Sequence, residues 1–201
     1  AWFEGALATL ERELTRSDSH GASRAVVGEG LARLIMADEE WLTSRADRFF
    51  GGGAGISREQ QIALTTALAV HNFHPRLFDP LVPSMTAALE VGDQLVAGWE
   101  TQSSPLQRIG EWIVTALLHG HVGPQHPMVV AFFSTVTPTV RGDALGHIAW
   151  EFMHAGTVDS VIRDRFAQLW DDRFEHVRQH PSDNEELHQF YWTVRSGKFE
   201  P

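Results

Sequence analysis

The sequence predicts an all-α fold. Apolar residues recur at intervals of three and four along almost the whole chain, which is the spacing that places side chains on one face of an α-helix. Residues that favour helix starts, namely Ser, Asp and Pro, precede several of these apolar stripes, and glycines follow some of them. The only β-like run, residues 135–140, contains Pro138, which cannot donate a ladder hydrogen bond.

In the first half of the chain, the stripes predict five helices. Their apolar positions span residues 3–14, 27–35, 42–49, 64–68 and 77–89. A polar stretch, residues 16–23, separates the first two, and Asp38 is expected to cap the third. The glycine-rich segment 51–55 should end the third helix, while Ser57 and Gln60 form a capping box for the fourth. Pro75 opens the fifth helix, and the prolines at 80 and 83 should keep its first turns irregular.

The second half predicts a similar series of helices. Their stripes span residues 109–117, 128–133, 145–152, 158–177 and 187–194. Ser104 and Pro105 have the residue types of a helix cap and a first helical position. The longest helix is expected near 157–180. Asp183 should cap the last helix, whose inward face would hold Leu187, Phe190, Tyr191 and Val194.

The helices suggest a repeated arrangement. A short apolar pattern recurs at residues 31–35, 64–68, 113–117 and 148–152, close to the period of helix-pair repeats. We therefore expect nine or ten helices in an irregular, HEAT-like array of antiparallel pairs. A single irregular helical bundle is the alternative, because any amphipathic helix produces this pattern. In both cases, residues 1–201 form one helical domain with a possible internal boundary at 92–104.

The charge and composition exclude several kinds of partner. The formal net charge is −10, which disfavours nucleic acid and anionic membranes. The apolar runs are too short to span a bilayer, and no signal peptide opens the chain. With no cysteine, disulfides and thiolate chemistry are excluded, and we expect a cytoplasmic protein. Fifteen of the sixteen basic residues are Arg, a bias typical of a GC-rich bacterial genome.

The chain ends predict a piece of a longer protein. No initiator Met is present, and the chain stops at G-K-F-E-P just after a strong helical pattern. We therefore expect neighbouring domains outside this sequence.

Three histidines close together are the first candidates for chemistry. His119, His121 and His126 fall in the stretch H-G-H-V-G-P-Q-H, and three imidazoles can bind zinc. However, His119 is predicted in the last turn of a helix, where positive charge is favourable, and His121 follows in a connecting loop. We therefore interpret the stretch as a helix end and keep these three residues as metal candidates only.

Two E-x-x-H pairs resemble a di-iron ligand pattern. They are Glu151 with His154 and Glu185 with His188, and their spacing places both groups on one face of a helix. The apolar stripes point the other way, so that Glu151, His147, His154 and Glu185 are expected in solvent. No nucleotide-binding or hydrolase motif occurs, so we predict no catalytic residue, no cofactor and no cofactor-binding residue.

Outer helix faces are the remaining candidates. Arg163, Arg173 and Glu175 lie on the long predicted helix, and its charged residues are expected to form surface ion pairs. Trp192 follows the predicted inward Tyr191; core or partly buried packing is the expectation for it, and an exposed ring that marks a contact is the alternative. We predict these four residues as interaction sites for a protein partner.

The closing run L-H-Q-F-Y-W-T-V-R-S-G-K-F-E-P, residues 187–201, resembles helical regions of large bacterial multidomain proteins. Such regions follow SIR2-like domains, and related arrays occur in defence NTPases. The resemblance implies a regulatory or assembly role beside an effector domain, with no SIR2 nucleotide-binding pattern in this chain. We expect a non-catalytic scaffold or interaction region that contacts a partner or neighbouring domains, with possible self-association. The alternative is a metal-dependent enzyme or a ligand-sensing domain that uses residues 119–126.

Overall fold

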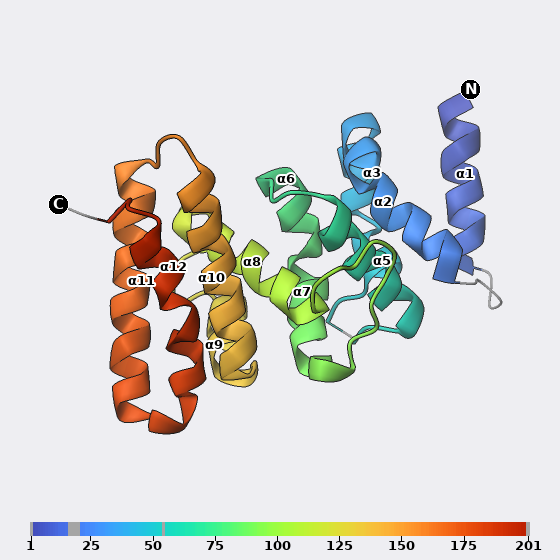
Figure 1. Ribbon diagram of the computed structural model, residues 1–201. Coiled ribbons are helices and arrows are strands. Elements are labelled where there is room, and N and C mark those ends of the chain that lie inside the picture. Colours follow the sequence, from blue (N-terminus) through green and yellow to red (C-terminus); the bar gives the residue numbers. More distant parts are fainter. Residues whose placement is uncertain (1, 16–20, 54, 200–201) are drawn as a thin grey trace. The chain divides into compact units, whose positions relative to one another are not determined.

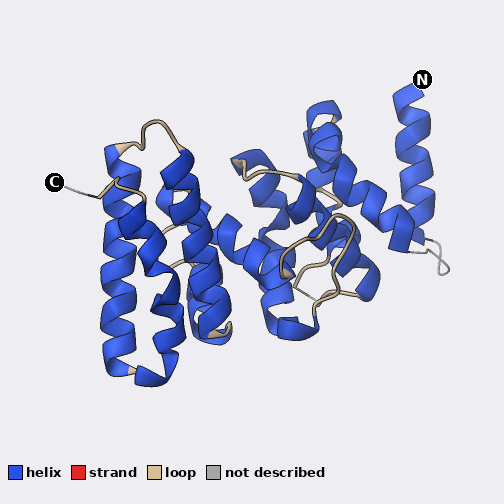
Figure 2. Ribbon diagram, in the orientation of Figure 1, coloured by secondary structure: helices blue, strands red, loops and turns tan. Residues whose placement is uncertain are grey.

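The computed structural model describes residues 2–15, 21–53 and 55–199. Throughout these residues the chain is all-α, as predicted, with helices α1 to α12, three 3₁₀ helices and no strand (Figures 1 and 2). An isolated bridge joins Gly52 and Gly55. The chain divides into two compact units, residues 1–105 and 106–201. In the described ranges, no helix combines the length and the apolar character needed to cross a membrane.

The first unit is built from short and medium helices. Their bounds are α1 (Trp2–Thr15), α2 (Gly21–Ala37), α3 (Glu39–Thr43), α4 (Ala46–Phe50), α5 (Arg58–Val70), α6 (Pro75–Phe78), η1 (Asp79–Leu81), α7 (Val82–Val91) and η2 (Gly92–Gln94). The predicted polar stretch 16–23 falls mostly on residues 16–20, which lie outside the described ranges, and α2 begins at Gly21.

Local capping signals explain where several of these helices begin and end. The Asp38 carboxylate accepts a hydrogen bond from the Trp41 amide at 2.9 Å, which confirms the predicted cap of α3. Ser57 and Gln60 form the predicted capping box of α5. Gly51 ends α4 with φ of 88°, a conformation that favours glycine.

Helices α2 and α5 form the centre of the first unit. A Cβ atom placed on Gly28 of α2 would lie 2.3 Å from the Ala63 carbonyl oxygen of α5. Only glycine permits this approach. The close contact buries Leu31, Leu64 and Leu68 completely.

Polar side chains on the buried face of α5 fix the irregular segment that follows η2. Gln61 accepts a hydrogen bond from the Val96 amide at 2.9 Å, and the Thr65 hydroxyl donates to the Val96 carbonyl at 3.1 Å. The Thr66 hydroxyl accepts from the Trp99 amide at 3.0 Å. These bonds give hydrogen-bond partners to backbone N–H and C=O groups of the loop, which have no partner within a helix.

The second unit contains longer helices. Their bounds are α8 (Pro105–Leu118), α9 (Pro127–Thr135), α10 (Pro138–His154), α11 (Ser160–Gln179), η3 (Pro181–Gln189) and α12 (Phe190–Arg195). A Cβ on Gly110 of α8 would lie 2.5 Å from the Phe132 ring of α9, so α8 and α9 pack closely at this point. Helix α10 contacts both η3 and α12, and α11 contacts η3.

The predicted last helix is wrong in two respects. Residues 181–189 form a 3₁₀ helix, which has about 3.0 residues per turn rather than 3.6. The apolar residues that start at Leu187 therefore do not fall on one inward face, and Tyr191 and Val194 are exposed instead of buried. Asp183 does not cap a helix, because its carboxylate bonds to side chains of α10 and α11.

Candidate functional site

A cluster of charged side chains lies inside the second unit, where α10, α11 and η3 meet. Glu186 of η3 is completely buried, and its carboxylate lies between Arg141 of α10 and Arg173 of α11. The Arg173 Nη2 donates to Glu186 Oε2 at 2.9 Å, while the Arg141 Nε lies 3.0 Å from the same oxygen. Two guanidinium groups thus surround one buried carboxylate. We name Arg141, Arg173, Asp183, Glu186 and His176 the ionic cluster.

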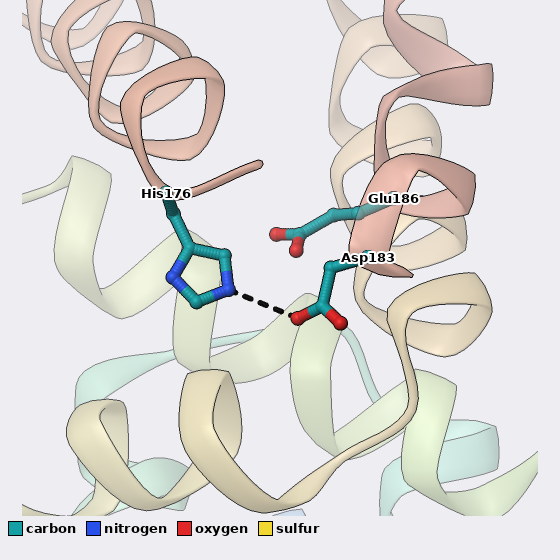
Figure 3. A group of neighbouring side chains, drawn as sticks. All are labelled: His176, Asp183 and Glu186. Atoms are coloured by element: carbon teal, nitrogen blue, oxygen red, sulfur yellow. Dashed lines mark hydrogen bonds and ion pairs between the residues drawn. The ribbon is translucent and has the colours of Figure 1, made fainter. Parts of the chain in front are cut away.

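Asp183 and His176 form the half-buried edge of the ionic cluster. Figure 3 shows the His176 ring directed at the Asp183 carboxylate, with the Glu186 carboxylate next to both. The His176 Nε2 lies 2.9 Å from Asp183 Oδ2, and Arg141 Nη2 donates to the same oxygen at 2.6 Å. The hydrogen bond with His176 has the largest effect in lowering the pKa of Asp183, and the hydrogen bond from Arg141 has the next largest. Ionised Asp183 therefore stabilises the fold at pH values above its ordinary pKa, and this contribution is lost as the pH falls through the pKa that Asp183 has in the folded protein.

The ionic cluster also contains the one group of three potential metal ligands found in the described part of the chain. Ligand atoms of His176, Asp183 and Glu186 lie within 4.8 Å of one another. Both carboxylates already face guanidinium groups, however, and Arg141 and Arg173 would repel an added cation. The donor set therefore fits an internal ion-pair network better than a metal site.

Two glycines allow the ionic cluster to close. A Cβ on Gly142 would lie 2.6 Å from the Glu186 carbonyl oxygen, and one on Gly146 would lie 2.7 Å from Cβ of Gln189. Helix α10 therefore approaches the backbone of η3 at Gly142 and the Gln189 side chain of η3 at Gly146. The Gln189 amide also donates to the Asp143 carboxylate at 2.9 Å, which links the same two elements.

A second charged group joins α8 to α10. Glu111 is buried, with 3% of its surface exposed, and it accepts hydrogen bonds from Gln107 and Arg108 of its own helix. His147 of α10 lies between two carboxylates, with Nδ1 3.8 Å from Glu111 and Nε2 3.5 Å from Glu151. The two carboxylates face opposite sides of the ring, so they do not converge on one point.

His147 is expected to titrate at a higher pH than an ordinary histidine. The Glu151 carboxylate raises the pKa of His147, Glu111 adds to this effect, and burial opposes it. Protonated His147 therefore stabilises the fold at pH values below its ordinary pKa, and this contribution is lost as the pH rises through the pKa that His147 has in the folded protein.

An NMR titration of the His147 ring signals should give a midpoint above the ordinary value of about 6.5, and Glu151→Gln should lower that midpoint. The exposed Glu175→Gln variant should leave it unchanged; an unraised midpoint would contradict the assignment.

The three histidines of the 119–126 stretch lie at helix ends. The His119 amide donates to the Thr115 carbonyl and the His121 amide to the Ala116 carbonyl, so both backbones close the end of α8. His126 precedes Pro127, and its Nδ1 accepts a hydrogen bond from the Met128 amide at 3.3 Å. Among the described residues, these three histidines do not form a metal-ligand group.

Two His-Pro pairs mark helix starts in this chain, which the sequence patterns considered above did not indicate. His74 precedes Pro75 and caps α6 in the way that His126 caps α9, because its Nδ1 accepts from the Arg76 amide at 3.2 Å. Two histidines therefore have capping roles that the residue types alone did not suggest.

The E-x-x-H pairs also lie outside the core. Glu151 and His154 are exposed on α10 and Glu185 is exposed on η3, as predicted, and His188 of η3, expected at the flank of the helix, is exposed as well. Glu185 accepts a hydrogen bond from the Thr139 hydroxyl at 2.6 Å. His147 is half-buried rather than fully in solvent.

The predicted interaction residues have different surroundings. Arg173 was expected on an outer face, and this prediction is wrong, because Arg173 is only 8% exposed and bonds to Glu186. Glu175 is exposed and lies 3.0 Å from Arg178, as expected of a surface ion pair. Arg163 is half-buried beside Asp164, at 3.5 Å. Trp192 is half-buried, with the Arg195 guanidinium carbon 5.5 Å from the centroid of its ring.

Helix α12 presents an apolar face to solvent. Tyr191 is 50% exposed and Val194 is 63% exposed, while Thr193 and Ser196 are buried. The Tyr191 ring lies 4.7 Å from that of Trp192, so the exposed side chains adjoin a half-buried aromatic ring. We name Tyr191, Trp192 and Val194 the α12 face. On this helix Phe190 packs against the rings of Trp170 and Phe174, whereas Tyr191 and Val194 remain exposed.

Comparison with known proteins provides no relative: no protein-family model, curated protein or solved structure matches the chain.

Proposed function

We propose that this chain is a non-catalytic helical region that binds a protein partner, as part of a larger bacterial protein in the cytoplasm. The α12 face carries this proposal. Tyr191 and Val194 place an aromatic and a branched side chain in solvent on one short helix, next to the half-buried ring of Trp192. Exposed apolar groups that adjoin an aromatic ring are typical of contact sites.

The buried charges support the same function. The buried carboxylate of Glu186 is paired with Arg141 and Arg173, and that of Glu111 with Arg108. Carboxylates held in this way stabilise helix packing and are not free to transfer protons to a substrate. The metal-dependent alternative loses support because His126 caps α9 with its ring nitrogen.

Site-specific photo-crosslinking tests the proposal. A benzophenone side chain at Tyr191 of the full-length protein, irradiated in the cells that produce it, should form an adduct of defined mass. The additional change Val194→Ser should reduce this adduct severalfold, because it removes apolar area from the contact. The same benzophenone at Asn184, which is exposed on η3, serves as the control. Equal adducts at both positions, or no effect of Val194→Ser, would contradict the proposal.

A further inference from the structure

A hollow of about 360 Å³ lies in the second unit between the end of α8, the loop after it and α11. Apolar side chains form much of its wall: Leu117, Val122, Pro124 and Leu169. Leu117 and Val122 are half-buried, so part of this apolar surface faces water. An apolar side chain that entered the hollow would remove this surface from water, which is favourable.

The wall of the hollow is held in place before any partner arrives. The Arg165 Nη1 of α11 donates to the Leu118 carbonyl at 2.8 Å and thereby closes the end of α8. Gly120 adopts φ of 71°, and a Cβ there would lie 2.6 Å from the same Nη1. The loop backbone and α11 are therefore in direct contact, and a preformed site loses little entropy on binding.

Acidic residues follow α11 past the hollow. Asp164, Asp171, Asp172 and Glu175 are all exposed, and their spacing places them on one face, opposite the buried Phe166 and Arg173. Asp172 itself lines the hollow. Arg178 pairs with Glu175 and Arg163 lies beside Asp164, whereas Asp172 accepts a hydrogen bond from the uncharged Gln168 at 3.0 Å. Asp171 and Asp172 are therefore the part of this face that most favours a cation. We name Asp164, Asp171, Asp172 and Glu175 the acidic stripe.

We propose that the hollow and the acidic stripe together dock a basic amphipathic segment of the protein partner. One apolar side chain of that segment enters the hollow, and Lys or Arg side chains lie against Asp171 and Asp172. This inference rests on the proposed function and specifies the partner's chemistry. Apolar contact provides the binding energy, and the complementary charge determines which segments are accepted.

A synthetic amphipathic peptide of Leu and Lys is the probe. Amide NMR spectra of the whole chain, recorded during titration at physiological salt, should show shifts at 117–124 and 168–172. A peptide with Glu in place of Lys should not bind. Asp171→Asn combined with Asp172→Asn should weaken binding about tenfold, since two exposed ion pairs are lost. Asp93→Asn, an exposed change in the first unit, should have no effect.

Gly123→Trp tests the hollow separately from the charge. A Cβ on Gly123 meets no atom within 4 Å, so the variant should fold, which its amide spectrum checks, while its ring occupies the space. Binding of the Leu and Lys peptide should become at least about tenfold weaker, because the peptide's apolar side chain has no room. Unchanged affinity in this variant or in the double Asp variant, or shifts confined to other faces, would overturn the docking site. The crosslink from Tyr191 is a separate readout, so it would still decide the proposed function.

Discussion

Replacing Glu186 by Gln should lower the free energy of unfolding by about 3–5 kcal/mol, the cost of breaking a buried ion pair from one side. Glu186 is completely buried, and its removal leaves Arg141 and Arg173 close together without the carboxylate that separates their charges. Urea denaturation, followed by amide signals of residues 106–201, measures the change as a lower midpoint with an unchanged slope.

The neighbouring Glu185 is a matched control. It is the same residue type on the same 3₁₀ helix, but it is exposed, and its carboxylate accepts a hydrogen bond from the Thr139 hydroxyl. Glu185→Gln should therefore change the stability by no more than about 0.5 kcal/mol. Equal effects of the two substitutions would show that the ionic cluster does not stabilise the unit.

Gly142→Ala should also destabilise the second unit, by about 1–3 kcal/mol, although Ala favours helices. The new Cβ would lie 2.6 Å from the Glu186 carbonyl oxygen and 3.1 Å from its Cα. Both are backbone atoms, so α10 and η3 would have to separate, and the bonds of the ionic cluster would lengthen. Thermal or urea unfolding of the second unit measures the effect.

Gly156 provides the comparison for this substitution. It lies in the loop between α10 and α11, and a Cβ there meets no atom within 4 Å. Gly156→Ala should leave the stability within about 0.5 kcal/mol of the original. If Gly142→Ala were equally harmless, the close approach of α10 to η3 would be contradicted.

Much of the fold could be predicted because its signals are local. The long helix expected near 157–180 is observed at Ser160–Gln179, and the caps at Asp38 and Ser57 act as predicted. These features depend on residues a few positions apart, which a sequence displays directly. Which side chains point inward after Pro181 could not be predicted from the sequence, because the spacing of the apolar residues does not show that residues 181–189 form a 3₁₀ helix.

The ionic cluster was missed because its members are far apart in the sequence. Arg173 and Glu186 are thirteen positions apart, and Arg141 and Asp183 are 42 apart. A signal was nevertheless present. Arg173 lies within the apolar stripe of α11 between Trp170 and Val177, so helical spacing alone places it inward. A charged residue in such a stripe predicts a buried partner of opposite charge.

The α12 face could not be predicted for a related reason. Its exposure depends on which side of α12 packs against α10, and the helical spacing within α12 does not show this. The close approach of α10 to η3 did have a signal, because Gly142 and Gly146 are spaced as G-x-x-x-G.

The charged side chains of the ionic cluster are partners of one another rather than ligands of a metal ion. The direct test is the thermal unfolding midpoint of the chain with and without excess Zn²⁺, compared between the original sequence and His176→Ala. We expect any zinc-induced shift to be small and the same in both proteins, because Arg141 and Arg173 already neutralise the carboxylates. Stabilisation of the original chain by about 2.7 kcal/mol or more, as a ligand at a hundred times its Kd would give, and its loss in His176→Ala, would contradict the account.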